Sequence, residues 1–219
     1  MIISYNFKME SFKEQKNEKD EARERKLEYV IEFSNHPTAT ELLPILEKYD
    51  PEKMLREITK KHLDIDSYKI VHNESLGDGA DWIENKGAEV NFNKGAKYVW
   101  LCVAHEMAHQ FLQEKPTWQN LDEAADIIER NNSYKSKKYN YTFQYAIEQT
   151  MACLLQAACE DKGPDTRPIQ WERWEDTFEV MVVKDFAEKF WQPFIGYLKD
   201  NSNYQNIDYF ILETLRKNY

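Results

Sequence analysis

Residues 103–111 read Val-Ala-His-Glu-Met-Ala-His-Gln-Phe, an apolar run that contains the pattern His-Glu-x-x-His. Residues four apart lie on one face of an α-helix, so His105 and His109 can bind a single ion. Glu106 sits about 100° around the helix from His105, where it can take a proton from a water that the ion activates. Two imidazoles and a nearby carboxylate suit zinc, which accepts nitrogen and oxygen ligands.

The residues around the motif support a helix, because apolar side chains recur there at steps of three and four. The positions on this face are Tyr98, Leu101, Cys102, His105, Ala108, His109 and Leu112. The motif resembles that of the zincin superfamily of zinc metallopeptidases. The resemblance implies a Zn²⁺ cofactor, a peptide or protein substrate and Glu106 as the general base. The alternative is a helix with two incidental histidines, one packed and one exposed.

A catalytic zinc site needs a third protein ligand besides the two histidines. The metzincin pattern is excluded, because the positions that require Gly and His hold Leu112 and Lys115. Gluzincins instead supply a Glu from a later helix. Glu148 is the only formal charge between Tyr141 and Cys159. A carboxylate buried in so apolar a helix needs a cation, so we expect Glu148 to bind the zinc.

Three other glutamates follow the motif. Glu129 has the spacing of many gluzincins but lies at a polar helix end, and it remains the alternative ligand. Glu123 is expected to cap its own helix, and Glu160 to face solvent. In thermolysin-like enzymes an Asp four residues after the ligand Glu orients the first His. Here that position is Ala152, which excludes close membership of that group and leaves no partner assigned to His105.

The resemblance also suggests where a substrate would bind. In zincins a strand above the motif helix commonly pairs with an extended peptide, and Val90, Asn91 and Phe92 are the candidates here. Their binding mode would be addition of a strand to a sheet edge. Zincins often add a donor for the developing oxyanion. Tyr134, Tyr139 and Tyr141 are unranked candidates for this role, and each could equally be a packing or surface residue.

The chain as a whole predicts one α+β domain, mostly helical, over residues 1–219. Residues 1–35 are expected to form a charged helix or arm, 36–115 an upper lobe with a small sheet and the motif helix, and 116–219 a helical lower lobe. A strand is expected at 68–72 and a hairpin at 80–92. Thr38 to Glu41 match a capping box, and Asp50-Pro51 should open a second helix. Aromatic stripes after residue 170 are expected to be core.

Composition narrows the possible partners. The 219 residues are 42% hydrophobic and 31% charged, with a net charge of −10. Such a charge argues against nucleic acid or an anionic membrane as the main partner. No apolar run is long enough to cross a bilayer. The first residues lack a signal sequence, so we expect a cytoplasmic protein unless an export segment has been removed. The three cysteines lie in apolar helical stretches and are expected to be reduced.

The sequence therefore predicts a zinc-dependent metallopeptidase. Two other functions remain open. One is a zincin-like binding protein without turnover, which the missing Asp permits and the intact Glu106 opposes. The other is a zinc hydrolase acting on a non-peptide amide.

Overall fold

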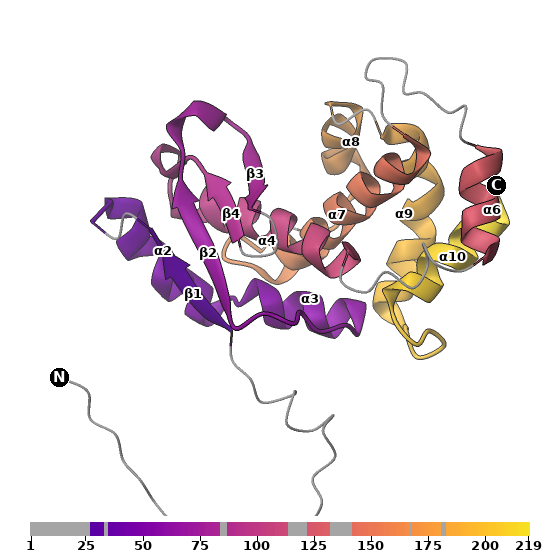
Figure 1. Cartoon of the computed structure of the whole chain (residues 1–219), viewed down its shortest axis with the longest axis horizontal. Coiled ribbons are helices and arrows are strands. Elements are labelled where there is room, and N and C mark those ends of the chain that lie inside the picture. The colour runs from indigo at the N-terminus through magenta and orange to yellow at the C-terminus, as the bar shows by residue number, and fades with distance from the viewer. Residues whose placement is uncertain are drawn as a thin grey trace, which may run out of the picture.

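The helix that carries the motif, α4 (Ala96–Gln113), lies near the centre of the molecule in the computed structural model (Figure 1). The sheet lies on one side of it and most of the later helices on the other. The structure describes residues 27–32, 35–83, 87–113, 122–131, 142–166, 168–180 and 183–219. Over these residues the protein is α+β and mostly helical, with a small mixed sheet towards the N-terminus, as the sequence predicted.

Four strands form the sheet in the described part of the chain. They are β1 (Glu28–Ile31), β2 (Ser67–His72), β3 (Ala80–Ile83) and β4 (Gly87–Val90), in the spatial order β1-β2-β4-β3. β1, β2 and β4 are parallel, and β3 pairs antiparallel with β4. The predicted strand and hairpin are both confirmed. β1 is a correction, because residues 28–31 were expected to belong to a charged helix or arm and instead form an edge strand.

Two helices precede the second strand. α2 (Pro37–Lys48) begins after His36, whose ring accepts a hydrogen bond from the Thr38 amide. The predicted capping box is therefore wrong, because Thr38 lies inside the helix and its hydroxyl donates to the Phe92 carbonyl at 2.8 Å. α3 (Pro51–Thr59) begins as predicted. The Asp50 carboxylate accepts from two amides of the first turn.

α4 runs antiparallel to α7 (Phe143–Lys162), the most extensive helix contact in the described fold. Trp100 near the start of α4 lies against Gly163 at the end of α7. A Cβ at Gly163 would lie 2.6 Å from the Trp100 ring, so only glycine allows the helices to approach this closely. α7 is buried along most of its length, as its apolar sequence predicted.

The remaining described helices are α6 (Asp122–Arg130), α8 (Trp171–Val180), α9 (Lys184–Lys199) and α10 (Ile207–Asn218), with the short 3₁₀ turns η1 (Glu74–Leu76) and η2 (Phe92–Lys94) before α4. The aromatic stripes of α8 and α9 are core, as predicted. Phe178, Phe186, Phe190 and Phe194 are all buried. None of the described helices is long and apolar enough to cross a membrane.

Candidate metal centre

The two histidines of the motif lie together on one face of α4. Their ring centroids are 4.9 Å apart, in an edge-to-face arrangement. His105 is 9% exposed, and His109 is half-buried. Helical spacing accounts for the contact, since the side chains of residues four apart lie one above the other. The structure thus brings together two of the predicted ligands.

Two glutamines of α7 contact the ring of His105 from opposite sides. The Oε1 atom of Gln156 lies 3.0 Å from Nδ1, and the Nε2 atom of Gln149 lies 3.2 Å from Nε2. Gln149 also hydrogen-bonds His109. Neither glutamine was predicted to belong to the site. No sequence pattern distinguishes them, because α7 also contains the uncharged polar residues Gln144 and Thr150.

Both imidazoles are neutral at physiological pH. Burial lowers the pKa of His105 to about 4, against a smaller raising effect from the hydrogen bond with Gln156. Burial, and then the neighbouring His105, lower the pKa of His109 to about 3, with Gln149 acting in the opposite direction. A metal ion requires unprotonated imidazoles. The donor chemistry of this pair therefore fits zinc, which readily accepts imidazole nitrogen.

Glu106 lies beside the pair and is 7% exposed. Burial, and next the charge of Asp81, raise the pKa of the Glu106 carboxyl to about 7. Asp81 belongs to β3, so the carboxyl group of Glu106 is on the side of α4 that faces the sheet. A carboxyl group with a pKa near neutrality is suited to accept and return a proton at physiological pH.

Glu148 lies one residue before Gln149 on α7 and is half-buried. Its carboxylate accepts a hydrogen bond from the Gln144 amide at 3.1 Å. Among the side chains that the structure describes, no group of three or more His, Cys, Asp and Glu residues is placed to hold a metal ion. The role of Glu148 as the third ligand therefore stays a prediction.

The other candidate glutamates lie in different settings. Glu129 is exposed on α6, which packs against α10 at the far end of the helical part (Figure 1). Glu160 is 8% exposed, rather than solvated as predicted, and accepts from the Gln156 amide. The side chain of Glu123 and the three candidate tyrosines, Tyr134, Tyr139 and Tyr141, lie outside the described residues.

The predicted substrate strand requires a correction. Val90 pairs with His72 of β2 on one side and with Ala80 of β3 on the other, so its strand is not at the edge of the sheet. Asn91 caps η2, and the Phe92 ring is fully buried. A peptide therefore cannot add to the sheet along these three residues. The free edge on this side belongs to β3.

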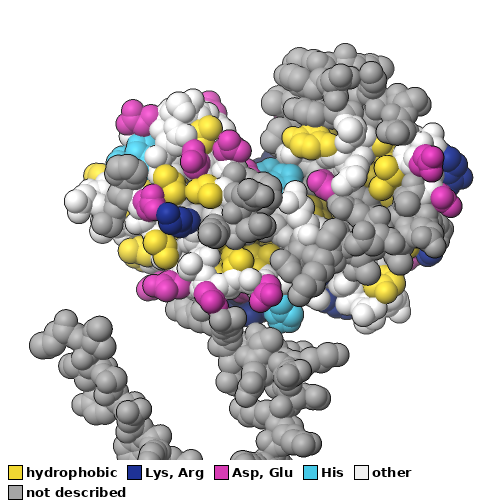
Figure 2. Space-filling view, in the orientation of Figure 1, with side chains coloured by type: hydrophobic (Ala, Val, Ile, Leu, Met, Phe, Trp, Pro, Cys, Tyr) yellow, Lys and Arg dark blue, Asp and Glu magenta, His cyan; other side chains and the backbone are white. Residues whose placement is uncertain are grey.

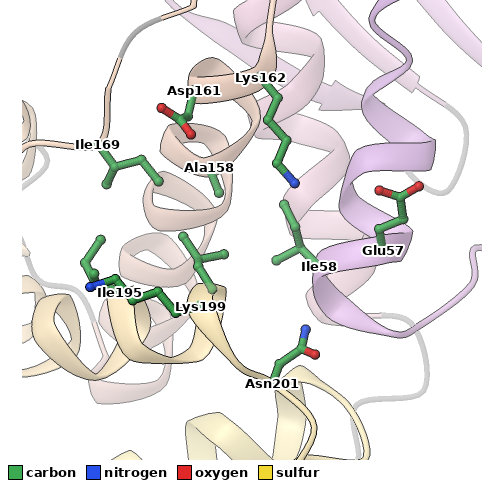
Figure 3. Close-up of a pocket in the computed structure, with 10 residues that line it drawn as sticks. Glu57, Ile58, Ala158, Asp161, Lys162, Ile169, Ile195, Lys199 and Asn201 are labelled. Carbon is green, nitrogen blue, oxygen red and sulfur yellow. The ribbon is translucent and has the colours of Figure 1, made fainter.

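The surface is hollowed between the sheet and the helical part, and a histidine side chain is visible in the hollow (Figure 2). A separate cavity of about 420 Å³ lies between α3, the end of α7 and α9 (Figure 3). Ile58 and Ile195 contribute apolar lining to it, and Asp161 and Lys162 contribute charge. None of its lining residues belongs to the motif or contacts His105 in the described structure.

The three cysteines are free, as predicted, with Cys153 and Cys159 buried and Cys102 half-buried. Cys153 lies near the site, where its Sγ atom is 3.8 Å from the Gln149 amide. Burial raises the pKa of the Cys153 thiol to about 12, so the thiol stays protonated at neutral pH in the arrangement described here. It is therefore a packing residue in this arrangement.

Comparison of the chain with protein-family models, with curated proteins and with solved structures finds no match.

Proposed function

We propose that this protein is a zinc-dependent metallopeptidase. The observation that carries the proposal is the pairing of two neutral imidazoles, one buried and one half-buried, with a carboxyl group whose pKa is about 7, all on one helix. If the two histidines were incidental packing residues, a buried acid directly after His105 would have no role. The net charge of −10 also favours a peptide over a nucleic acid as the partner.

His105, His109 and Glu148 would hold the zinc. When bound, zinc supplies Lewis-acid chemistry, polarising a carbonyl group and acidifying water. Gln149 would have to turn its amide away from His105 Nε2, because an N–H donor and a cation compete for the same lone pair. Glu148 precedes Gln149 directly on α7, about 100° around the helix, so its carboxylate would have to leave Gln144 and turn towards the histidines.

Glu106 would act as the general base and then as the general acid. Its carboxylate accepts a proton from the attacking water and returns it to the leaving amine, a role that contributes about 10²- to 10⁴-fold in typical enzymes. Burial supports this role, since it brings the pKa of the carboxyl group close to the pH at which both transfers must occur.

The substrate would be an extended peptide lying along the free edge of β3. That strand is antiparallel to its neighbour β4 and carries Asp81, which acts electrostatically on Glu106. An exposed edge offers unpaired backbone groups that an added strand can satisfy. The edge of β3 thus takes over the pairing with the substrate that was first expected of residues 90–92.

The test compares wild type with Glu106→Gln. Zinc content is measured by mass spectrometry, and hydrolysis with a fluorogenic peptide library. We expect wild type to bind one zinc and cleave peptides, and Glu106→Gln to keep the zinc and lose at least about 100-fold in rate. Glu52→Gln is the control, because Glu52 is also buried but lies on α3, where its carboxylate pairs with Arg56. Undiminished hydrolysis by Glu106→Gln would overturn the mechanism.

A second function is a zincin-like binding protein without turnover. The observation that favours it is the Gln149 amide against His105 Nε2, where a catalytic site would leave the lone pair free for the metal. This protein would bind peptides without cleaving them.

Screening non-peptide amides in the same assay tests the third function, hydrolysis of another amide.

A further inference from the structure

The ring of His105 belongs to a chain of hydrogen bonds that runs along one face of α7. Gln149, Gln156 and Glu160 are spaced by seven and four residues, so their side chains line up towards α4. The Gln156 amide nitrogen lies 3.4 Å from a carboxylate oxygen of Glu160. The other end of the same amide contacts His105 at 3.0 Å. Glu160 is thus linked to His105 through Gln156.

The direction of each hydrogen bond in this chain is fixed by chemistry. The amide nitrogen of Gln156 donates to a carboxylate oxygen of Glu160. The oxygen of the same amide then faces His105, and it can only accept a hydrogen bond from Nδ1–H. On the opposite side of the ring, the Gln149 amide nitrogen can only donate, so it requires a lone pair on Nε2.

Both sides of the ring therefore specify the same tautomer, with the proton on Nδ1 and the lone pair on Nε2. Only one of the two neutral forms of an imidazole satisfies both neighbours. His105 is fully enclosed by protein on these sides, being 9% exposed, so water offers little alternative. Reversing the tautomer would set donor against donor at Gln149 and acceptor against acceptor at Gln156.

We propose that Gln156, oriented by Glu160, is the positioning residue that holds His105 in the Nδ1–H tautomer and so keeps Nε2 available as a ligand. The link to metal affinity rests on the proposed zinc site, whereas the tautomer does not. Partners of this kind orient metal-binding histidines, and their loss typically costs 10- to 100-fold in metal affinity. Gln156 is therefore the partner that orients His105, a role that Ala152 cannot fill.

The test removes the acceptor without changing the volume of the side chain. Gln156→Met replaces the amide oxygen by a thioether, which is only a weak acceptor for Nδ1–H. The matched control Gln149→Met removes the donor on the other side of the ring. The ring nitrogens of His105 are observed by ¹⁵N NMR in labelled, full-length protein, both metal-free and with zinc. Zinc affinity is measured by competition with a chelator. Circular dichroism checks that each variant is folded.

We expect wild type to show a protonated Nδ1 and an unprotonated Nε2. Gln156→Met should bind zinc about 10- to 100-fold more weakly. Gln156→Met combined with Gln149→Met leaves neither amide to select a tautomer, so this pair should show a mixture of tautomers. Gln149→Met should keep the Nδ1–H tautomer. The double variant Gln156→Glu with Glu160→Gln exchanges the carboxylate and the amide, and so restores an acceptor at Nδ1 at the same total charge. We expect it to recover the wild-type tautomer.

Persistence of the wild-type tautomer in the variant that combines Gln149→Met with Gln156→Met would overturn the proposal. If that variant does not fold, Glu160→Gln in the Gln149→Met background is the second probe, because it frees the Gln156 amide to rotate and should also mix the tautomers. A wild-type protein that binds no zinc would remove the proposed function instead. The ¹⁵N spectra of metal-free protein would still decide the role of Gln156.

Discussion

The ammonium group of Lys61 lies 3.3 Å from the carboxylate of Asp208, and the two side chains are 7% and 0% exposed. Lys61 follows α3, and Asp208 is in the first turn of α10, so the pair joins the N-terminal part of the described fold to its last helix. Asp208→Asn should lower the free energy of unfolding by about 3–5 kcal/mol, because it breaks a buried ion pair by removing the charge of one partner. Urea titration measures the change. Glu213→Gln, which breaks an exposed ion pair with Lys217, is the control and should cost less than about 1 kcal/mol.

Adjacent residues of α7 allow the third zinc ligand to be tested. Glu148→Gln should greatly reduce zinc binding, because it removes the carboxylate that we propose as ligand. In that background, Gln149→Glu should restore binding, since it places a carboxylate where the amide now contacts His105 Nε2. Isothermal titration with zinc measures both effects.

The alternative ligand provides the control for this experiment. Glu129→Gln alters an exposed residue of α6 and should leave zinc affinity unchanged. Loss of zinc in Glu129→Gln, with normal binding by Glu148→Gln, would reverse the assignment.

Acidification should destabilise the metal-free protein through its two motif histidines. Their pKa values in the folded protein, about 4 for His105 and about 3 for His109, lie below the usual 6.5. Their contribution to stability is therefore fully present above pH 6.5 and is lost as the pH falls towards those values. Each group contributes about 1.4 kcal/mol per pH unit in this window.

Comparison with His105→Gln isolates one of these contributions. The difference in unfolding free energy between wild type and variant should shrink between pH 6.5 and 4.5. Glu106, with its raised pKa of about 7, acts in the opposite direction, stabilising below pH 4.5 and losing that contribution as the pH rises through 7. It is common to both proteins, so parallel pH curves for the two would contradict the prediction.

Removing the hydroxyl group from each of two buried tyrosines should change the stability of the protein differently. The Tyr68 hydroxyl has no hydrogen-bond partner among the described residues, whereas the Tyr197 hydroxyl donates to the Ile58 carbonyl at 2.6 Å. Tyr68→Phe should leave the stability unchanged or raise it by about 1 kcal/mol. Tyr197→Phe should lower it by about 1–2 kcal/mol, because a buried carbonyl loses its donor. Thermal unfolding of the two variants provides the comparison, and a large loss in Tyr68→Phe would show that its hydroxyl has a partner.

Periodicity predicted the elements that depend on local pattern. The motif helix, the apolar helix α7, the hairpin and the cap at Asp50 all follow from side chains close together in sequence. The two histidines and Glu106 follow in the same way, since a helix fixes their relative positions whatever surrounds them.

The features that sequence could not predict depend on contacts between distant segments. Thr38 matched a capping box, but its hydroxyl is used by the Phe92 carbonyl, 54 positions away. Residues 28–31 become a strand because β2 lies beside them. The strand around Val90 was expected to form an edge, yet it pairs on both sides because β3 folds back over it.

The glutamines beside His105 were missed for a related reason. Metal ligands are usually ionisable residues, and an uncharged amide in a buried helix has no distinguishing pattern of its own. Gln149 and Gln156 acquire their role only when α7 packs antiparallel to α4. Only the tertiary structure could supply that relationship.

Because Trp100 and Gly163 are in contact, the number of residues between Gly163 and the two glutamines determines where those glutamines lie relative to His105. The contact sets the position of α7 along the axis of α4. If α7 moved along that axis by one helical turn, the glutamines would be displaced by about 5.4 Å from His105. A single residue inserted between Gln156 and Gly163 would turn the preceding part of α7 by about 100° and so move both glutamines away from His105, although no residue of the candidate site is substituted. Distant homologues of this protein should therefore tolerate substitutions within this segment more readily than insertions or deletions.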